Sequence, residues 1–286
     1  MSPIRLVKLD LLMERSSGNS GIAIGLIDGP VAMDHPDLVG EHIRVTGSVG
    51  AACSLSASIA CRHGTFVAGI LSARRGSSAP AICPDCTLLL RPIFPESDVR
   101  NGQMPSATPQ ELATAIQEVV EAGARVINLS AALLQPTSPG LQKLQQALDF
   151  AAVRGVITVA AAGNQGTVGS SAITRHPWVI PVVGCNLQGR PTMESNLGNS
   201  IGRRGLAAPG ENITSLGTAG EPETFGGTSA AAPFVTGTIA LLWSEFPTAS
   251  AASVRLAITQ AGVVSRGRIT PPVLDAWRAY QTMSSN

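Results

Sequence analysis

Short apolar runs rich in β-branched residues alternate along this chain with longer segments of helical periodicity, and this alternation limits the fold more than any other feature. One helical segment begins near Pro109 and ends at Gly123, a residue that favours helix C-termini. Its aliphatic side chains, from Leu112 to Val120, share one face, and it leads directly into the apolar run 125–129. Helix-to-strand steps of this kind predict an α/β fold, with a mostly parallel central sheet and helices on both faces.

The same pattern recurs along the chain. A helix opened by Pro139 and ended by Gly155 precedes another apolar run, and nearly every residue of 229–245 is apolar, which predicts a buried helix there. Further strands are expected at 22–27, 156–160 and 179–183. In a parallel sheet, sites form in the loops that follow the carboxyl ends of the strands, so candidate functional residues are sought in those loops.

The length of the chain fits one domain. A chain of 286 residues that is 44% hydrophobic can bury one large core. We therefore expect a single domain over 1–286, with its motifs between about 20 and 262. A closing helix is expected over about 271–283, with Val273, Leu274 and Trp277 facing inward.

The charge balance names no partner. Only 14% of the residues are charged and the formal net charge is +1, so we expect neither nucleic-acid nor membrane binding, and nothing indicates an oligomeric state. Arg5, Lys8 and Asp10 interrupt any apolar signal core at the N-terminus. We expect a cytoplasmic protein, or a secreted one if a signal or pro-segment has been removed from the natural sequence.

Five cysteines form an odd and loosely spaced set, which does not define a disulfide scaffold. Cys83 and Cys86 are either a local bridge or free thiols, Cys53 and Cys61 are a second candidate bridge, and Cys185 is expected to be a small buried residue. No second close cysteine pair has zinc-finger spacing, and no loop has the regularly spaced carboxylates of a calcium site. We therefore predict no cofactor and no required metal.

Two segments carry residues that suit acid–base chemistry. Asp28 ends the apolar run Ile24-Gly25-Leu26-Ile27, and His63 stands in Arg62-His63-Gly64-Thr65, where a polar side chain enters an apolar helix. Taken singly, each side chain reads as a cap of a turn or helix. The remaining histidines are assigned to turns, surface or structure, and they are His35, His42 and His176.

Two further segments supply a nucleophile and an amide. Ser229 follows Gly226-Gly227-Thr228 at the start of the predicted buried helix, where the helix dipole favours developing negative charge. Asn164 lies between Gly163 and Gln165 after a predicted strand, and its amide is an oxyanion donor if it faces Ser229. The four segments occur in the order Asp, His, Asn, Ser.

These segments resemble the subtilisin family of serine peptidases across approximately residues 20–262. The resemblance implies a subtilisin-like fold, a catalytic triad of Asp28, His63 and Ser229, and Asn164 in the oxyanion hole. It also implies that an extended peptide pairs with an edge of the chain. The residues expected to bind this substrate are Leu129, Ser130, Ala131, Ala132, Leu133 and Gly163.

Three features depart from the usual family pattern. Gly29 follows Asp28 in place of serine or threonine, and Ala131 and Ala132 replace residues that usually continue Ser-Leu-Gly-Gly, which would reshape the peptide groove. Only 27 residues precede Asp28, so we expect no inhibitory pro-segment. A finer resemblance links the chain to proteases that cut leader peptides from cyanobactin-type precursors, and this resemblance implies a precursor-peptide substrate.

Other functions fit the sequence less well. A general degradative subtilisin is the first alternative. A peptide-binding pseudoprotease would not need all four catalytic positions. An unrelated α/β hydrolase would place its serine before its acid and histidine, which is the opposite of the order here.

Overall fold

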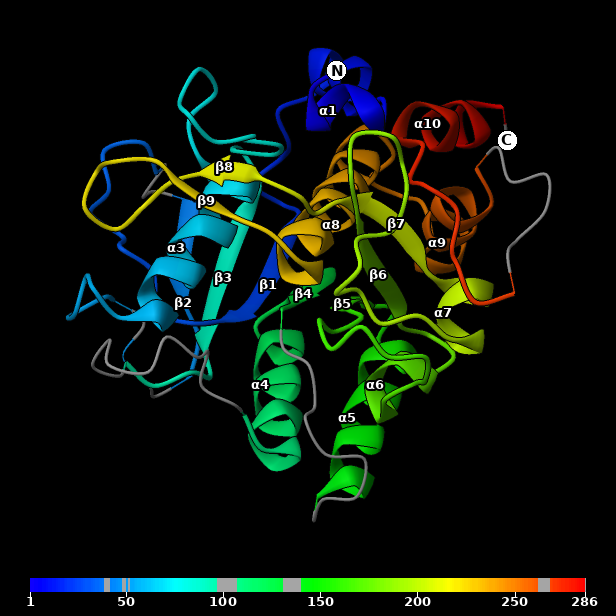
Figure 1. Ribbon diagram of the computed structural model, residues 1–286, viewed down its shortest axis with the longest axis horizontal. Helices are drawn as coiled ribbons and strands as arrows, with labels where there is room; N and C mark the ends of the chain where they lie inside the picture. The colour runs from blue at the N-terminus through cyan, green and yellow to red at the C-terminus, as the bar shows by residue number, and fades with distance from the viewer. Residues whose placement is uncertain are drawn as a thin grey trace.

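The computed structural model describes residues 1–38, 42–47, 50, 52–96, 107–130, 140–261 and 268–285 (Figure 1). Its centre is a sheet in the order β2-β3-β1-β4-β5-β6-β7, and every neighbouring pair is parallel. The strands are β1 (Ala23–Asp28), β2 (Ile43–Val45), β3 (Thr87–Pro92), β4 (Val126–Leu129), β5 (Ile157–Ala161), β6 (Ile180–Cys185) and β7 (Leu206–Pro209). The predicted strands are all present, displaced by one or two residues at their ends.

Ten helices and a small hairpin accompany this sheet in the described residues. The hairpin joins β8 (Ile213–Ser215) to the antiparallel β9 (Glu223–Phe225). The helices are α1 (Pro3–Leu6), α2 (Leu9–Arg15), α3 (Ile59–Ser72), α4 (Pro109–Glu121), α5 (Leu141–Val153), α6 (Ala172–Arg175), α7 (Asn199–Arg204), α8 (Thr228–Glu245), α9 (Ala251–Gln260) and α10 (Ala276–Ser284).

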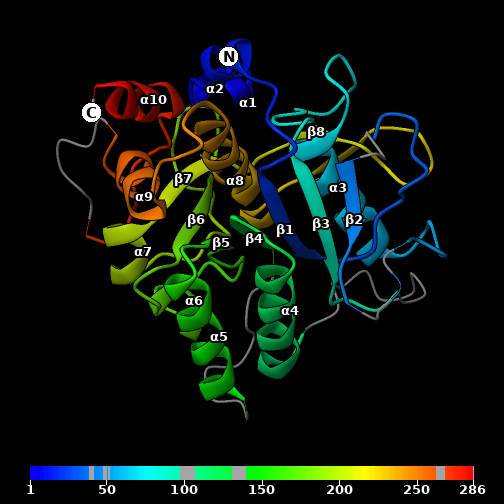
Figure 2. The same ribbon diagram turned by 180° about the vertical axis from the view of Figure 1, so that it is seen from behind.

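Helices cover both faces of the sheet, as the periodicity predicted (Figures 1 and 2). α4 and α5 pack on one face, where Leu112 joins Ile27 in one core cluster. α3 and α8 pack on the other, where Phe66 and Phe234 join Leu26 in a second cluster. Because side chains alternate along a strand, the adjacent residues Leu26 and Ile27 supply opposite cores. The α/β architecture with a parallel sheet is therefore confirmed.

α4 shows how the sequence sets one of these boundaries. Pro109 occupies the first turn, where a missing N–H costs nothing. The Thr108 hydroxyl accepts a hydrogen bond from the Glu111 N–H at 3.2 Å, and the Glu111 carboxylate accepts one from the Thr108 N–H at 2.8 Å. This reciprocal cap fixes the helix start at the residue that the sequence indicated.

α8 is the buried helix that the sequence predicted. Every residue from Thr228 to Trp243 is buried except Ser229, which is partly exposed near the helix start. Burial of an aromatic such as Phe234 stabilises the fold, and truncating it to alanine costs about 3–5 kcal/mol. The Thr236 hydroxyl also donates to the Asn128 side chain at 2.9 Å, which ties α8 to β4. The nucleophile candidate is thus carried on an element that the core holds firmly.

The two ends of the chain pack together. Lys8 forms an ion pair with Asp275 at 2.6 Å, and the Ala276 N–H donates to the Val7 carbonyl at 2.9 Å. The closing helix begins at Ala276, later than the expected start near 271. Leu274 is buried as expected, and Val273 is partly buried and packs against the same core cluster, so it also faces inward. Trp277 is partly buried, and its ring stacks on that of Tyr280 with a centroid separation of 5.0 Å. That residues 1–286 form one domain stays a prediction.

Candidate active site

Three side chains from distant parts of the sequence meet at the carboxyl end of the sheet. Asp28 is the last residue of β1 and is fully buried, His63 lies in the second turn of α3, and Ser229 is the second residue of α8. The Asp28 Oδ1 atom lies 2.7 Å from His63 Nδ1, and His63 Nε2 lies 2.9 Å from Ser229 Oγ. A continuous line of hydrogen bonds therefore runs from a buried carboxylate to a partly exposed hydroxyl.

Glycines at the foot of α3 make this alignment possible. A Cβ atom built at Gly29 would lie 2.0 Å from the Ala60 carbonyl oxygen, and one at Gly64 would lie 2.4 Å from that of Pro30. The Ala32 N–H donates to the Thr65 hydroxyl at 2.9 Å, which draws the loop after β1 against the helix. Close approach of the backbones therefore excludes the serine or threonine that usually follows the family aspartate.

The Asp28 carboxylate controls the charge of His63. Burial by itself lowers the pKa of His63, but the negative charge of Asp28 and its hydrogen bond outweigh burial, so the pKa is raised above the ordinary histidine value. The Gly29 N–H also donates to Asp28 Oδ1 at 2.7 Å. Asp28 Oδ2 is buried and has no hydrogen-bond partner among the described residues. One oxygen of the carboxylate thus orients the imidazole, which places the other imidazole nitrogen against Ser229.

Asn164 is held against the start of α8 by its side-chain oxygen. Asn164 Oδ1 accepts hydrogen bonds from the Thr228 N–H and hydroxyl, both at 2.9 Å. Gly227 has φ 92°, and a Cβ there would lie 2.7 Å from Asn164 Nδ2, so only glycine fits. Within the described part of the chain, Nδ2 has no hydrogen bond, and Asn164 is exposed. Its two N–H groups are therefore free to bind a ligand.

The structure modifies the expected substrate edge. Leu129 pairs with Ile27 on one side and with Ala160 on the other, so this residue is not at an edge. Ser130 is buried, and its hydroxyl accepts a hydrogen bond from the Asn128 side-chain amide at 2.9 Å. Ala131, Ala132 and Leu133 lie outside the described residues.

Gly163 is engaged in the scaffold of the site. Its N–H donates to the Thr228 hydroxyl at 3.1 Å, and its carbonyl accepts from the Asn196 N–H at 2.8 Å. It therefore positions the loop of Asn164 through hydrogen bonds of its own.

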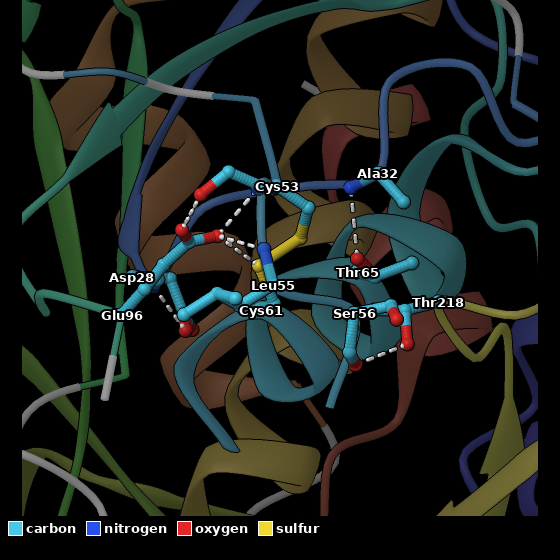
Figure 3. Close-up of a disulfide and its surroundings, with 11 residues drawn as sticks. Asp28, Ala32, Cys53, Leu55, Ser56, Cys61, Thr65, Glu96 and Thr218 are labelled. Carbon is cyan, nitrogen blue, oxygen red and sulfur yellow. Dashed lines mark hydrogen bonds between the residues drawn. A yellow bond between two sulfur atoms is a disulfide. The ribbon is translucent and has the colours of Figure 1, made fainter. Parts of the chain in front are cut away.

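A disulfide joins Cys53 to Cys61 (Figure 3), and Cys61 is two residues before His63 in the sequence. Cys53 and Cys61 are bonded, whereas Cys83, Cys86 and Cys185 are buried free thiols, so the local bridge between Cys83 and Cys86 is not formed. Cys185 is buried as expected, and burial raises its pKa to about 12, which leaves it unreactive at neutral pH.

The loop that carries Cys53 is also held by Glu96. Its carboxylate accepts the Ser54 N–H at 2.7 Å and the Leu55 N–H at 3.2 Å (Figure 3). Among the described residues, Cys53, Cys61 and Glu96 form the one group with the spacing of a metal site. Because the two sulfurs are bonded to each other, they are not available as thiolate ligands.

Sequence reasoning missed the residues that support these side chains. Thr228 orients Asn164, and Asn196 holds the neighbouring loop, since its Oδ1 accepts the N–H groups of Gln165 and Thr167, both at 3.1 Å. Thr228 precedes Ser229 and could have been considered from its position. Asn196 has no local signal, because it is brought to the site by β6 and the loop that follows.

The same triad occurs on unrelated folds, so the fold and the order of the three residues distinguish the classes. A parallel α/β sheet with the order aspartate, histidine, serine defines the subtilisin-like class of serine proteases. Comparison with known proteins agrees, because the model of the subtilase family matches residues 19–270. The chain belongs to the subtilase family, and it is a serine-type endopeptidase.

Relatives of known sequence and structure support this assignment. Subtilisin DY of Bacillus licheniformis is 30% identical over 258 residues, covering 88% of this chain and 87% of that protein. Some other bacterial relatives are longer, and the chain spans 55% and 63% of the length of two of them.

Two solved structures are similar over most of the chain. A mutant of the protease domain of PatA is 30% identical with a TM-score of 0.84, and it covers 94% of this chain and 98% of its own. The prenylagaramide maturation protease PagA is 26% identical with a TM-score of 0.83, covering 96% and 98%. No helix in the described residues is long and apolar enough to span a membrane.

Proposed function

We propose that Asp28, His63 and Ser229 are the catalytic triad of this protease. The observation that carries the proposal is the pair of hydrogen bonds, 2.7 and 2.9 Å long, that links the three side chains in a line. His63 Nε2 takes the hydroxyl proton as Ser229 Oγ attacks the peptide carbonyl carbon. The imidazolium then gives that proton to the leaving amine, and an acyl-enzyme remains at Ser229.

Water completes the reaction by the same route. His63 takes a proton from a water molecule that attacks the ester carbon, and then returns it to Ser229 Oγ as the acid product leaves. Asp28 stays ionised throughout and stabilises the imidazolium by its charge. Complete burial of Asp28 strengthens that interaction, because no water competes with it.

Asn164 supplies a donor to the oxyanion in this proposal. Its Oδ1 is occupied by Thr228, so its Nδ2 group is oriented in advance and has no other partner among the described residues. A donor fixed before the reaction stabilises the charge of the tetrahedral intermediate without any cost of reorganisation. The start of α8 adds the positive end of its dipole at Ser229.

The substrate class in this proposal is a ribosomally made precursor peptide, from which the enzyme removes the leader. Support comes from the similarity to PatA, one structure of which is described as the patellamide maturation protease, and to PagA. The departures at Ala131 and Ala132 support selectivity, because added side-chain atoms exclude many extended peptides by steric clash.

A peptide library tests both parts of the proposal. The protein of 286 residues would be incubated with diverse peptides that include leader-bearing precursors, and the cut sites would be mapped by mass spectrometry. We expect few cut sites, concentrated at leader junctions. Cutting after many unrelated residues would instead indicate a general degradative subtilisin.

The control for this experiment is Ser229→Ala. It should remove all cleavage within detection, since the equivalent change in subtilisin is known to lower kcat by roughly 10⁶-fold. A folded Ser229→Ala protein that cuts as fast as the natural chain would contradict the assigned nucleophile.

A further inference from the structure

Three arginines converge on a pocket between α7 and α9, away from the residues described above. The pocket has a volume of about 320 Å³ and is lined by Arg203 and Arg204 from the end of α7 and by Arg255 from α9. Its remaining lining residues are Pro177, Leu256, Thr259 and Gln260. α7 and α9 lie side by side in both ribbon views (Figures 1 and 2). We call this feature the arginine pocket.

Among the residues that the structure describes, no negative charge balances the arginine pocket. Its lining includes no acidic residue, and none of the three arginines forms an ion pair among the described residues. Burial lowers the pKa of Arg255, and the charge of Arg204 lowers it further. Burial likewise lowers the pKa of Arg204, and Arg203 adds to that effect. The positive charge of Arg204 is therefore repelled by that of Arg203 and by that of Arg255, and the pocket gathers like charges.

Arg204 and Arg255 are each held in place by the Nη2 group of the guanidinium. Arg204 Nη2 donates to the carbonyls of Thr174 and Arg175 at 3.1 and 2.9 Å. Arg255 Nη2 donates to the Pro177 carbonyl at 2.6 Å, and its guanidinium lies over the Trp178 ring, 5.0 Å from the centroid. These contacts hold two positive groups rigidly at the wall of the pocket.

Much donor capacity remains unused in that arrangement. The Nε atoms of Arg204 and Arg255 are buried without a hydrogen-bond partner, and neither Nη1 atom donates to any described residue. Arg203 is exposed, and its side chain has no hydrogen bond within the described part of the chain. Arginine forks match the oxygen pairs of phosphates and carboxylates, so the Nη1 groups of Arg204 and Arg255 and the exposed side chain of Arg203 suit an oxyanion. The two Nε atoms are enclosed by protein and do not face such a ligand.

The arginine pocket lies at the opposite end of the sheet from the candidate active site. Arg204 precedes the first residue of β7 and Pro177 precedes the first of β6, whereas Asp28 is the last residue of β1. All neighbouring strands are parallel, so the beginnings and the ends of strands lie at different ends of the sheet. A ligand in this pocket would not compete with the peptide at Ser229.

We propose that the arginine pocket binds a compact oxyanion with at least two negative charges, of the diphosphate or tricarboxylate type. The volume exceeds what a single water molecule occupies, about 30 Å³, and accommodates a small multivalent anion. Such an anion neutralises the repulsion among the three arginines and joins α7 to α9. Binding should therefore raise the melting temperature of the protein.

Calorimetry with two probes tests this proposal. Ser229→Ala protein, which is protected from self-digestion, would be titrated with inorganic pyrophosphate and with citrate at low ionic strength. We expect binding of at least one probe, a rise in melting temperature with its concentration, and loss of affinity as sodium chloride is added. Tighter binding of pyrophosphate assigns a phosphate-type ligand, and tighter binding of citrate assigns a carboxylate-type ligand.

Matched variants locate the site. Arg203→Gln should weaken binding at least fivefold and Arg203→Glu at least twentyfold, and both should fold because Arg203 is exposed. Arg190→Gln and Arg190→Glu change another exposed arginine and should leave the affinity unchanged. Absence of binding for both probes, or equal weakening by the Arg203 and Arg190 variants, would overturn the proposal.

Discussion

Two buried histidines in this protein each bond to an aspartate, and they differ in what surrounds the pair. His63 bonds through Nδ1 to Asp28, which is fully buried, and its Nε2 faces Ser229. His176 bonds through Nε2 to Asp149 at 3.0 Å, and the Asp149 side chain is 61% exposed. The remaining nitrogen of His176, Nδ1, accepts the Trp178 N–H at 3.2 Å.

The comparison shows which features of a histidine–aspartate pair suit catalysis. The hydrogen bond from the Trp178 N–H fixes the tautomer of His176 and occupies the nitrogen that a reaction would need. The pair of His176 and Asp149 is therefore structural, and it holds the end of α6 in place. His63 keeps that nitrogen for a hydroxyl, and its carboxylate is shielded from water. The free nitrogen and the buried acid distinguish the candidate catalytic pair from the structural one.

Replacing the aspartates sharpens this difference most strongly. Asp28→Asn should lower kcat by about 10⁴-fold, because the imidazole loses its preferred tautomer and its stabilising charge. Asp149→Asn should change kcat less than threefold and stability by at most about 1 kcal/mol, because that carboxylate is largely exposed. Steady-state kinetics and denaturant unfolding measure both effects, and equal kinetic losses would remove the distinction between the pairs.

Asn164 gives the next largest effect. Asn164→Ala should lower kcat by roughly 10²- to 10³-fold with little change in KM, which is the loss known for removing the oxyanion asparagine of subtilisin. Thr228→Val is a second informative variant. It removes the hydroxyl that orients Asn164 but leaves the Asn164 side-chain amide in place. An unchanged kcat with a raised KM would make Asn164 a residue of substrate binding instead.

The pH profile of kcat/KM reports the state of His63. Only neutral His63 can accept the proton, and its pKa is raised, so activity should fall about tenfold per pH unit below a midpoint that lies above the ordinary histidine value. At pH values above this midpoint kcat/KM should no longer change with pH through His63, because the imidazole is already neutral. His176→Asn should leave this midpoint in place, and a midpoint that moved with His176 would reverse the roles of the two histidines.

Among the changes made next to the triad, reduction of the disulfide should have the smallest effect on activity. Cys53 and Cys61 are eight residues apart, so removing the bridge costs roughly 2–3 kcal/mol of stability by loop entropy. We expect some loss of kcat, because Cys61 lies on α3 with His63. The loss should be only a few-fold, because nearly all of α3 is buried in the core. Urea unfolding and kinetics with and without dithiothreitol measure this, and a Cys53→Ala/Cys61→Ala variant should be insensitive to the reductant.

The fold and the triad neighbourhood could be predicted from the sequence because local signals agree there. The periodicity around Leu112 and the apolar run of α8 indicated two helices. The residues next to His63 and Ser229 indicated a catalytic site. The cysteine pairing was not predictable, since spacings of three and eight residues both permit a bridge, and tertiary packing selected Cys53 with Cys61. The central place of Leu129 in the sheet was hidden for the same reason, because only strand pairing reveals that this residue is flanked on both sides.

Labelling with a fluorophosphonate tests the central claim most directly, since this reagent bonds only to an activated serine. Peptide mapping should find one adduct, on Ser229, and the rate of labelling should collapse in His63→Ala while His176→Ala reacts like the natural protein. An adduct on another serine, or equal labelling of Ser229 after loss of His63, would contradict the assignment of Asp28, His63 and Ser229 as one catalytic unit.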